Sequence, residues 1–351
     1  MKIVLTGGGT LGHVTPHFAI IPYLNKCDLY YIGSIDGIEK EYIKSKNIKY
    51  YEISSGKLRR YFSLKNFTDP FRVIKGFFDA KKHLKNIKPD VIFSKGGFVS
   101  VPVVLAASQL KIPVIIHESD ITVGLANRIA SKYANTVCTS FNEAASQIKG
   151  EKSIVTGSPI REEIKTGNEK RAMEFCGFKK KRKTILIMGG SLGAQKVNEI
   201  VRDSLDILLQ DYNIIHLCGK GKTDGSINKE GYVQFEFVGD ELKDLFKITD
   251  IIISRAGSNS IFEFAYLNIP HILIPLPSKN SRGDQLLNAK SFEKIGFSKV
   301  LLQENLNSII LCKQVKELDK NREIYINNMK KSNKINGSKK IAELINKFDV
   351  K

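Results

Sequence analysis

The chain has 351 residues, which exceeds one ordinary hydrophobic core and fits two domains. Its 55 Lys and Arg outnumber 36 Asp and Glu, a formal net charge of +19 that favours an anionic partner such as a phosphorylated substrate, anionic lipid or nucleic acid. The five cysteines stand singly, so we expect a reducing compartment. Residue 1 leads directly into a strand pattern, and Pro, Gln and Lys interrupt the most apolar stretch, 101–116. We therefore expect neither a signal peptide nor a membrane span.

Short β-rich runs alternate with helical patterns along both halves of the chain, which predicts parallel sheets with crossover helices. The strands expected in the first half lie near residues 2–6, 29–32, 48–53, 90–94, 113–117, 136–140 and 153–156. Those of the second half lie near 184–188, 213–217, 232–238, 250–253, 270–274 and 299–302. The charged stretch 161–183 interrupts the pattern. We predict two doubly wound α/β domains, 1–160 and 161–330, a C-terminal helix in 331–351, and ligands at the carboxyl ends of the strands.

Two segments share one plan, in which an apolar strand is followed by a glycine turn and a polar helix start. They are residues 2–13, with glycines in 7–12, and residues 184–195, with glycines in 189–193. A glycine turn at a helix start leaves N–H groups unpaired beside the positive end of the helix dipole, so each turn is suited to an anion. Two such turns indicate two α/β domains that face a shared cleft and act on two phosphorylated substrates.

Residues 7–12 also match G-x-G-x-x-G, the dinucleotide-binding spacing. That interpretation needs an acidic residue at the end of the second strand to hold a ribose, whereas the strand at 29–32 ends in Gly33-Ser34. The second glycine turn does not fit the spacing at all. We therefore disfavour a nicotinamide or flavin enzyme and expect no cofactor.

The first half holds two acid–base candidates. His13 directly follows the first glycine turn, where an imidazole is suited to take a proton from a hydroxyl or, when charged, to pair with a phosphate. Its structural alternative is a helix-capping or packing histidine. Glu118 follows an apolar strand at the edge where ligands are expected, and its structural alternative is a capping or ion-paired carboxylate.

The second half holds two segments suited to sugar hydroxyls. Residues 255–263 follow a strand and open a helix, where Glu263 is suited to accept from two vicinal hydroxyls, although a solvated helix glutamate is the alternative. Residues 284–289 begin another helix, and Asp284 and Gln285 present polar side chains there.

Residues 57–85, here called the basic–aromatic segment, hold nine Lys or Arg against two Asp. Its aromatic residues are Tyr61, Phe62, Phe67, Phe71, Phe77 and Phe78. Such a segment is either an amphipathic helix with its aromatics in the core or an interfacial surface for anionic membranes. RNA binding would use the same residue types, but no RNA-binding signature is present and we expect no nucleic acid partner.

Seven ordered motifs resemble those of the MurG family, the bacterial N-acetylglucosaminyltransferases of peptidoglycan synthesis. They occupy residues 6–16, 93–102, 117–120, 157–161, 189–194, 255–263 and 284–289, and so span nearly the whole chain. The resemblance implies the GT-B fold of two Rossmann-like domains, with a C-terminal helix that returns to the first. It also implies transfer of N-acetylglucosamine from UDP-N-acetylglucosamine to the C4 hydroxyl of the muramyl sugar in undecaprenyl-diphosphate-MurNAc-pentapeptide (lipid I), with inversion, to form lipid II.

The resemblance assigns a role to each candidate residue. The residues implied for the donor are Thr10, Gly12, Arg161, Ser191, Ser258, Asn259, Ser260, Glu263, Asp284 and Gln285. Those implied for the acceptor are Gly8, Gly9, Asp120 and Asn127, in and beside the first glycine turn. His13 is favoured over Glu118 as the catalytic base. No D-x-D metal motif is present, and helix N-terminal amides with Ser191 would stabilise the leaving group without a metal.

The same resemblance implies a peripheral location on the cytoplasmic face of the cell membrane, with the basic–aromatic segment on anionic lipid. Cell-wall and division machinery are further candidate partners. Three positions depart from the motif pattern: Leu11 stands where many members have Gly, Asp120 where some have Asn, and Asp284 where some have Gln. The alternatives are a GT-B enzyme with another lipid acceptor and a non-catalytic, membrane-associated scaffold.

Overall fold

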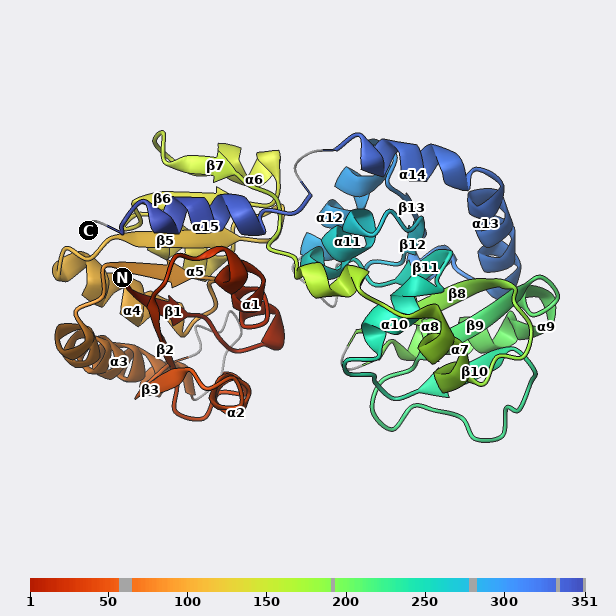
Figure 1. The fold of residues 1–351 in the computed structure, drawn as a ribbon, viewed down its shortest axis with the longest axis horizontal. Coiled ribbons are helices and arrows are strands. Elements are labelled where there is room, and N and C mark those ends of the chain that lie inside the picture. The colour runs from red at the N-terminus through yellow and green to blue at the C-terminus, as the bar shows by residue number, and fades with distance from the viewer. Residues whose placement is uncertain (57–64, 191–192, 278–282, 333–334, 350–351) are drawn as a thin grey trace. The chain divides into compact units, whose positions relative to one another are not determined.

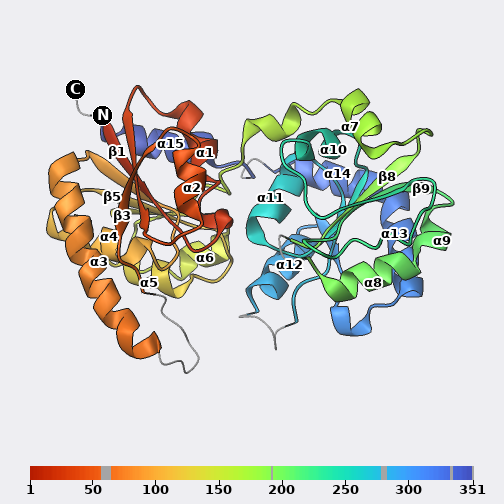
Figure 2. The ribbon, with the colours of Figure 1, turned by 90° about the horizontal axis from the view of Figure 1, so that it is seen from below.

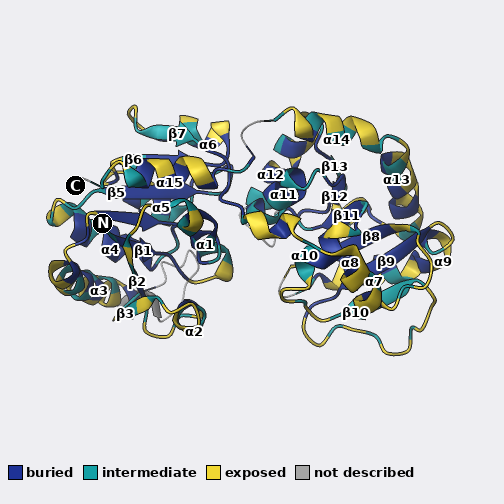
Figure 3. Cartoon of the chain, in the orientation of Figure 1, coloured by how far each residue is buried: buried dark blue, intermediate teal, exposed yellow. Residues whose placement is uncertain are grey.

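The computed structural model describes residues 1–56, 65–190, 193–277, 283–332 and 335–349 (Figure 1). The chain forms two compact units, Met1–Arg161 with Lys334–Lys351, and Glu162–Asn333. Each unit is a parallel sheet flanked by helices, as Figures 1 and 2 show. The strands form the buried centre of each unit, and the exposed residues lie on the outer helix faces and the loops (Figure 3).

The first unit is built on a seven-stranded sheet in the order β3-β2-β1-β4-β5-β6-β7. Its strands are β1 (Lys2–Thr6), β2 (Asp28–Ser34), β3 (Lys49–Ile53), β4 (Val91–Ser94), β5 (Val114–Glu118), β6 (Thr136–Thr139) and β7 (Ser153–Val155). Leu5 of β1 lies between Tyr31 of β2 and Phe93 of β4. The strand order therefore reverses between β1 and β4, and ligands bind doubly wound sheets at such a switch point.

Helices cover this sheet, and the C-terminal segment is part of the same unit (Figure 1). They are η1 (Leu11–His13), α1 (His17–Ile20), η2 (Ile21–Tyr23), α2 (Glu39–Lys44), α3 (Lys65–Ile87), α4 (Ser100–Gln109), α5 (Leu125–Ala130), α6 (Asn142–Ser146) and α15 (Ser338–Asn346). The apolar face of α15 joins the core of β1 through Ile341 and Ile345. Asn346 Nδ2 donates to the Tyr23 carbonyl at 3.0 Å, which ties α15 to η2.

The second unit repeats the plan with a six-stranded sheet in the order β10-β9-β8-β11-β12-β13. Its strands are β8 (Lys183–Met188), β9 (Tyr212–Leu217), β10 (Tyr232–Phe235), β11 (Ile251–Ser254), β12 (His271–Leu273) and β13 (Ser298–Val300). Ile253 of β11 pairs with Ile187 of β8 on one side and with Ile272 of β12 on the other. The switch point of this sheet lies between β8 and β11.

Helices pack on both faces of the second sheet, which buries nearly continuous Ile and Leu runs as parallel strands require. They are η3 (Glu162–Lys165), α7 (Glu169–Cys176), α8 (Gln195–Asp203), α9 (Leu205–Leu208), α10 (Leu242–Lys247), α11 (Ser258–Tyr266), α12 (Asp284–Lys294), η5 (Gln303–Asn305), α13 (Ser308–Lys320) and α14 (Arg322–Lys330). Every strand predicted from the sequence is present, although the strand expected at 232–238 ends at Phe235.

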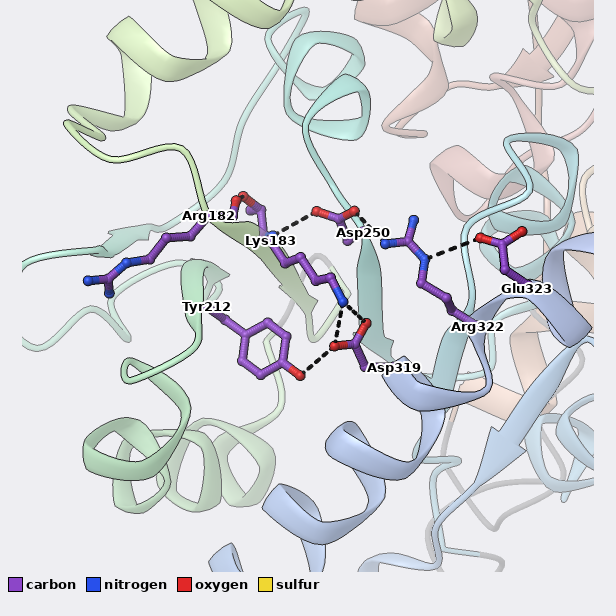
Figure 4. Close-up of polar contacts among 8 residues, drawn as sticks. Arg182, Lys183, Tyr212, Asp250, Asp319, Arg322 and Glu323 are labelled. Carbon is purple, nitrogen blue, oxygen red and sulfur yellow. Dashed lines mark hydrogen bonds and ion pairs between the residues drawn. The ribbon is translucent and has the colours of Figure 1, made fainter.

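A polar network fastens α13 and α14 to the second sheet (Figure 4). Asp319 accepts from Lys183 Nζ at 2.8 Å and from Tyr212 OH at 2.9 Å. Asp250 accepts from the Thr184 amide at 2.9 Å and pairs with Arg322 at 3.0 Å. Lys183 and Thr184 begin β8, so this network lies at the amino ends of the strands, opposite the edge where ligands bind, and its role is structural.

Among the described helices, none combines the length and apolar character that a membrane span requires.

Candidate functional site

Two glycine turns meet at the switch point of the first sheet. Residues 7–9 follow β1 and residues 96–97 follow β4. Gly97 has φ +82°, and a Cβ there would lie 2.3 Å from the Gly8 carbonyl oxygen, so only glycine permits this approach. Glycine turns at the carboxyl edge of a parallel sheet are suited to a phosphate group.

Three histidines lie near this edge, and the structure separates their roles. His17 is fully buried, its Nδ1 lies 2.9 Å from the Val14 carbonyl, and burial lowers its pKa to about 4. His117 is also fully buried, and both of its ring nitrogens are engaged. His13, at the end of η1, is only half-buried. Of the three, His13 is therefore the imidazole that is partly exposed.

Glu118 ends β5 and caps the loop that leads into α5. Its Oε1 accepts from the Asp120 amide at 3.0 Å, and its Oε2 accepts from the Gly124 amide at 3.0 Å and from Asn127 Nδ2 at 2.9 Å. The side chain is 6 % exposed, and burial together with the Asp120 charge raises the pKa of its carboxyl, against these hydrogen bonds. This is the capping geometry that the sequence left open as the alternative to a catalytic base.

The other residues predicted for the acceptor gather at the same edge. Asn127, on α5, donates to Glu118 and to the His117 carbonyl at 3.2 Å. Its Oδ1 is buried, has no hydrogen-bond partner among the described residues, and lies 2.8 Å from where a Cβ on Gly96 would be. Asp120 is half-buried in the loop after β5. The turns after β1, β4 and β5 thus bring together the predicted Gly8, Gly9, Asp120 and Asn127 with His13.

Thr10 and Gly12, predicted for the donor, also lie at this edge, in the turn that enters η1. Thr10 is exposed and accepts the His13 amide at 3.1 Å through its carbonyl, and Gly12 is half-buried.

Two buried charged residues at this edge were not predicted as site residues. Lys95 follows β4, and its Nζ lies 2.7 Å from His117 Nδ1 and also contacts Ser119 Oγ. Glu39, at the start of α2, is fully buried; it accepts the Ser34 amide at 3.0 Å, and its Oε1 lies 2.6 Å from where a Cβ on Gly8 would be. An acidic residue therefore does reach the first glycine turn, although it follows the second strand by five residues.

The second sheet carries its glycine turn at the switch point between β8 and β11. Gly193 has φ +67°, and a Cβ there would lie 2.1 Å from the Cys218 carbonyl oxygen. Helix α8 follows directly at Gln195. Ser191, predicted to face the nucleotide diphosphate, lies outside the described residues.

Helix α11 begins at this same edge, directly after β11. Ser258, Asn259 and Ser260 form its first turn, whose amides have no partner within the helix. Ser258 is buried, whereas Asn259, Ser260 and Glu263 are half-buried. Glu263 lies one turn after Ser260 and shares its face, so the helix start and this carboxylate present anion-binding and hydroxyl-binding groups together.

Arg255 ties the loops of this edge to one another. Its Nη1 donates to the Ile274 carbonyl at 3.0 Å and to the Pro275 carbonyl at 3.2 Å, and its Nη2 donates to Gln303 Oε1 at 2.6 Å. The Arg255 amide also donates to the Met188 carbonyl at 3.3 Å. These hydrogen bonds thus connect the carboxyl ends of β8, β11 and β12.

Asp284 and Gln285 start α12 on the next loop along this edge, and both are half-buried. Gln285 Oε1 accepts from the Leu276 amide at 3.1 Å, which ties the start of α12 to the loop after β12. Asn288 Nδ2 donates to the Ala256 carbonyl at 3.3 Å and joins α12 to the start of α11.

Arg161, also predicted for the donor, ends the first unit and is half-buried. The preceding Ile160 is bound to the C-terminal segment, since its amide donates to Ser338 Oγ at 2.9 Å.

The described part of the basic–aromatic segment forms α3, along one flank of the first unit (Figure 2). Residues 57–64, with Tyr61 and Phe62, lie outside the described residues. Phe71 is 73 % exposed, Ile74 56 % and Phe78 62 %, whereas Ala80 and Leu84 are buried. The exposed lysines of the outer face are Lys75, Lys82 and Lys85. These three apolar side chains are therefore not part of the core, as the interfacial alternative requires.

Comparison with known proteins agrees with this architecture. The family model described as the glycosyltransferase family 28 N-terminal domain matches residues 3–139, and that for the family 28 C-terminal domain matches residues 184–345. The solved MurG of Acinetobacter baumannii superposes with a TM-score of 0.77 at 28 % identity, over 99 % of both chains. A calicheamicin glycosyltransferase shares the fold, with a TM-score of 0.72 at 10 % identity, over 99 % of this chain and 98 % of its own.

Relatives in two clostridia match along the whole chain. One from Clostridium botulinum (strain Loch Maree) is 56 % identical over 350 residues, and one from Clostridium perfringens (strain SM101) is 55 % identical over 349 residues. The matches cover 99 % of this chain in both cases, and 99 % and 98 % of the two relatives. Both relatives are named UDP-N-acetylglucosamine–N-acetylmuramyl-(pentapeptide) pyrophosphoryl-undecaprenol N-acetylglucosamine transferase.

The chain has two doubly wound sheets, each with a glycine turn at its switch point, and the two family 28 models match residues in both. These features together define a GT-B glycosyltransferase. Within this class, the 56 % identity with the Clostridium botulinum relative over the full length identifies the family. The chain belongs to the MurG family.

Proposed function

We propose that this chain transfers N-acetylglucosamine from UDP-N-acetylglucosamine to lipid I and so forms lipid II. The observation that carries the proposal is the 56 % identity, over 99 % of both chains, with a relative named for this transfer. The site geometry supports it, because each sheet presents an anion-binding turn with hydroxyl-binding or acid–base side chains beside it.

The second unit takes the donor. The glycine turn after β8 and the first-turn amides of α11 face the diphosphate, where their partial positive charge stabilises the leaving UDP. Glu263 accepts from the ribose hydroxyls, and Gln285 and Asp284 bind the sugar. Ser191 completes the donor contacts of this unit, and Arg161, which ends the first unit, is a further donor residue. Arg255 orders the three loops that carry these groups.

The first unit takes the acceptor. The turns at 7–9 and 96–97 hold the lipid diphosphate, and Asp120 and Asn127 contact the acceptor sugar. His13 removes the proton from the C4 hydroxyl as that oxygen attacks the anomeric carbon, and UDP leaves from the opposite face in a single displacement with inversion. His13 suits this role because it is half-buried beside the turn, whereas His117 has both nitrogens engaged.

Glu118 supports this chemistry without touching the reacting atoms. Its carboxylate already accepts three N–H groups of the loop and helix that carry Asp120 and Asn127. We therefore assign it to positioning the acceptor loop.

The outer face of α3 brings the enzyme to its lipid substrate at the cytoplasmic face of the membrane. Exposed Phe71, Ile74 and Phe78 insert at the interface, while the neighbouring lysines pair with anionic headgroups. Enzymes of the cell-wall and division machinery are candidate neighbours there.

Complementation tests the function in a cell. A bacterium depleted of its own MurG-family enzyme receives this chain or its His13→Ala variant, each at equal protein level. We expect the unaltered chain to restore growth and lipid II, and the variant to leave lipid I accumulated. Continued lipid I accumulation with the folded, expressed wild-type chain would overturn the proposal.

A further inference from the structure

Lys95 is a buried cation that the proposed reaction does not use. It directly follows β4, beside the glycine turn at 96–97, and its side chain is 1 % exposed. A buried ammonium is costly unless neighbouring groups compensate its charge. The groups around Lys95 therefore indicate its role.

Hydrogen bonds fix the ammonium against the loop after β5. Lys95 Nζ donates to His117 Nδ1 at 2.7 Å and to Ser119 Oγ. Since His117 Nδ1 accepts this bond, its Nε2 carries the proton and donates to the Gly157 carbonyl at 3.0 Å. One chain of contacts thus joins the turn after β4, the loop after β5 and the second residue after β7.

The charges around Lys95 are mainly negative. Glu118 and Asp120 attract the ammonium, while burial keeps the imidazoles of His17 and His117 neutral and the Lys95 charge further lowers their pKa. Burial lowers the pKa of Lys95 to about 7, and these acidic groups oppose the shift. Glu118 and Asp120 also oppose each other's ionisation, since the Asp120 charge raises the pKa of Glu118.

Without a cation, residues 118–120 would place two carboxylates beside a turn that is proposed to bind a diphosphate. Negative side chains close to a buried anion site weaken the binding of the anion. Lys95 is the neighbouring cation, because its Nζ contacts Ser119, which stands between Glu118 and Asp120 in the chain.

We propose that Lys95 is a positioning residue of the acceptor site, whose buried ammonium offsets the charge of Asp120 and so keeps the loop after β5 compatible with an anionic acceptor. This inference rests on the proposed function, because its test measures transfer to the acceptor. It assigns Lys95 no contact with the substrate.

A double-mutant cycle tests the charge relationship. The variants are Lys95→Met, which keeps the length of the side chain without its charge, Asp120→Asn, and both together, with the exposed Lys149→Met as the matched control. Transfer from UDP-N-acetylglucosamine to a soluble-chain lipid I analogue gives kcat and KM, and the thermal unfolding midpoint is measured in parallel.

We expect Lys95→Met alone to lower kcat/KM for the acceptor at least tenfold, with UDP affinity unchanged within twofold. In the Asp120→Asn background the same substitution should cost less than threefold, because the charge it offsets is gone. Lys149→Met should behave as wild type. Equal losses from Lys95→Met in both backgrounds, or no loss in either, would overturn the inference.

The unfolding midpoints keep this test separate from the proposed function. Absence of transfer by the wild type would refute the function, but the midpoints would still decide the inference. If Lys95 offsets the charge of Asp120, Lys95→Met should lower the unfolding midpoint more in the wild-type background than in the Asp120→Asn background. Equal midpoint shifts in the two backgrounds would overturn the inference.

Discussion

Replacing Glu118 with Ala should destabilise the first unit by about 3 kcal/mol. Its carboxylate accepts three N–H groups, from Asp120, Gly124 and Asn127. Charge-assisted hydrogen bonds contribute about 1.5 kcal/mol each at the low end, or roughly 4 to 5 kcal/mol together. The raised pKa of Glu118 shows that burial and Asp120 oppose its ionisation, which offsets part of this gain. Glu118→Gln keeps one acceptor oxygen and should lose only about 1 to 2 kcal/mol.

Urea unfolding followed by far-ultraviolet circular dichroism measures these losses, since the chain has no Trp. Hydrogen exchange over residues 118–130 then localises them, with the exposed Glu151→Gln as the control. We expect Glu118→Ala to speed exchange in this segment and Glu118→Gln to retain at least a tenth of the wild-type transfer rate. The opposite result, unchanged stability with Glu118→Gln as inactive as Glu118→Ala, would refute the capping role and identify Glu118 as the base.

Three further predictions concern His13, the outer face of α3 and the buried His271. His13→Ala should lower kcat at least a hundredfold while calorimetry finds UDP affinity unchanged within twofold, and an equal loss of UDP affinity would contradict its place on the acceptor side. Serine at Phe71, Ile74 and Phe78 together should weaken sedimentation with anionic vesicles at least tenfold, whereas unchanged binding would return this face of α3 to a structural role. Burial lowers the pKa of His271 to about 4, so the stability that neutral His271 contributes above pH 6.5 is lost as the pH falls toward 4, by about 1.4 kcal/mol per pH unit. His271→Gln should therefore have a shallower fall in unfolding free energy between pH 7 and 5, and an identical pH slope would refute this origin.

The sheets could be predicted from the sequence because their strands are buried on both faces. Runs such as residues 184–188 and 250–253 are almost entirely apolar and recur at βαβ spacing, which leaves few topologies open. Glycine turns after β1 and β8 then located both switch points. His13 lies in η1 and Glu263 in α11, the first helices after β1 and β11, and their roles stay predictions.

The roles of Glu118 and Lys95 could not be predicted in the same way, because they depend on tertiary contacts. Glu118 follows an apolar strand whether it is a base or a cap, and only the converging amides of residues 120 and 124 distinguish the two. Lys95 stands beside two glycines, where a lysine is normally solvated. Its burial becomes visible only once β5 lies beside β4 and brings His117 within 2.7 Å.

Glu39 shows a different limit. A search for an acid at the end of the second strand stops at Ser34, because that rule assumes a short loop. The chain instead turns through the four residues 35–38 and returns Glu39 against Gly8 from the start of α2. A lone glutamate in a charged helix carries no sequence signal for such burial.

Transfer of labelled N-acetylglucosamine by the purified chain tests the central claim most directly. UDP-N-acetylglucosamine is supplied with a soluble-chain lipid I analogue, and with a diacylglycerol acceptor in parallel. We expect label in the lipid I analogue alone, through a β1,4 linkage to the muramyl sugar, and loss of this product in His13→Ala. Label in the diacylglycerol, or no product from a chain that still binds UDP, would contradict it.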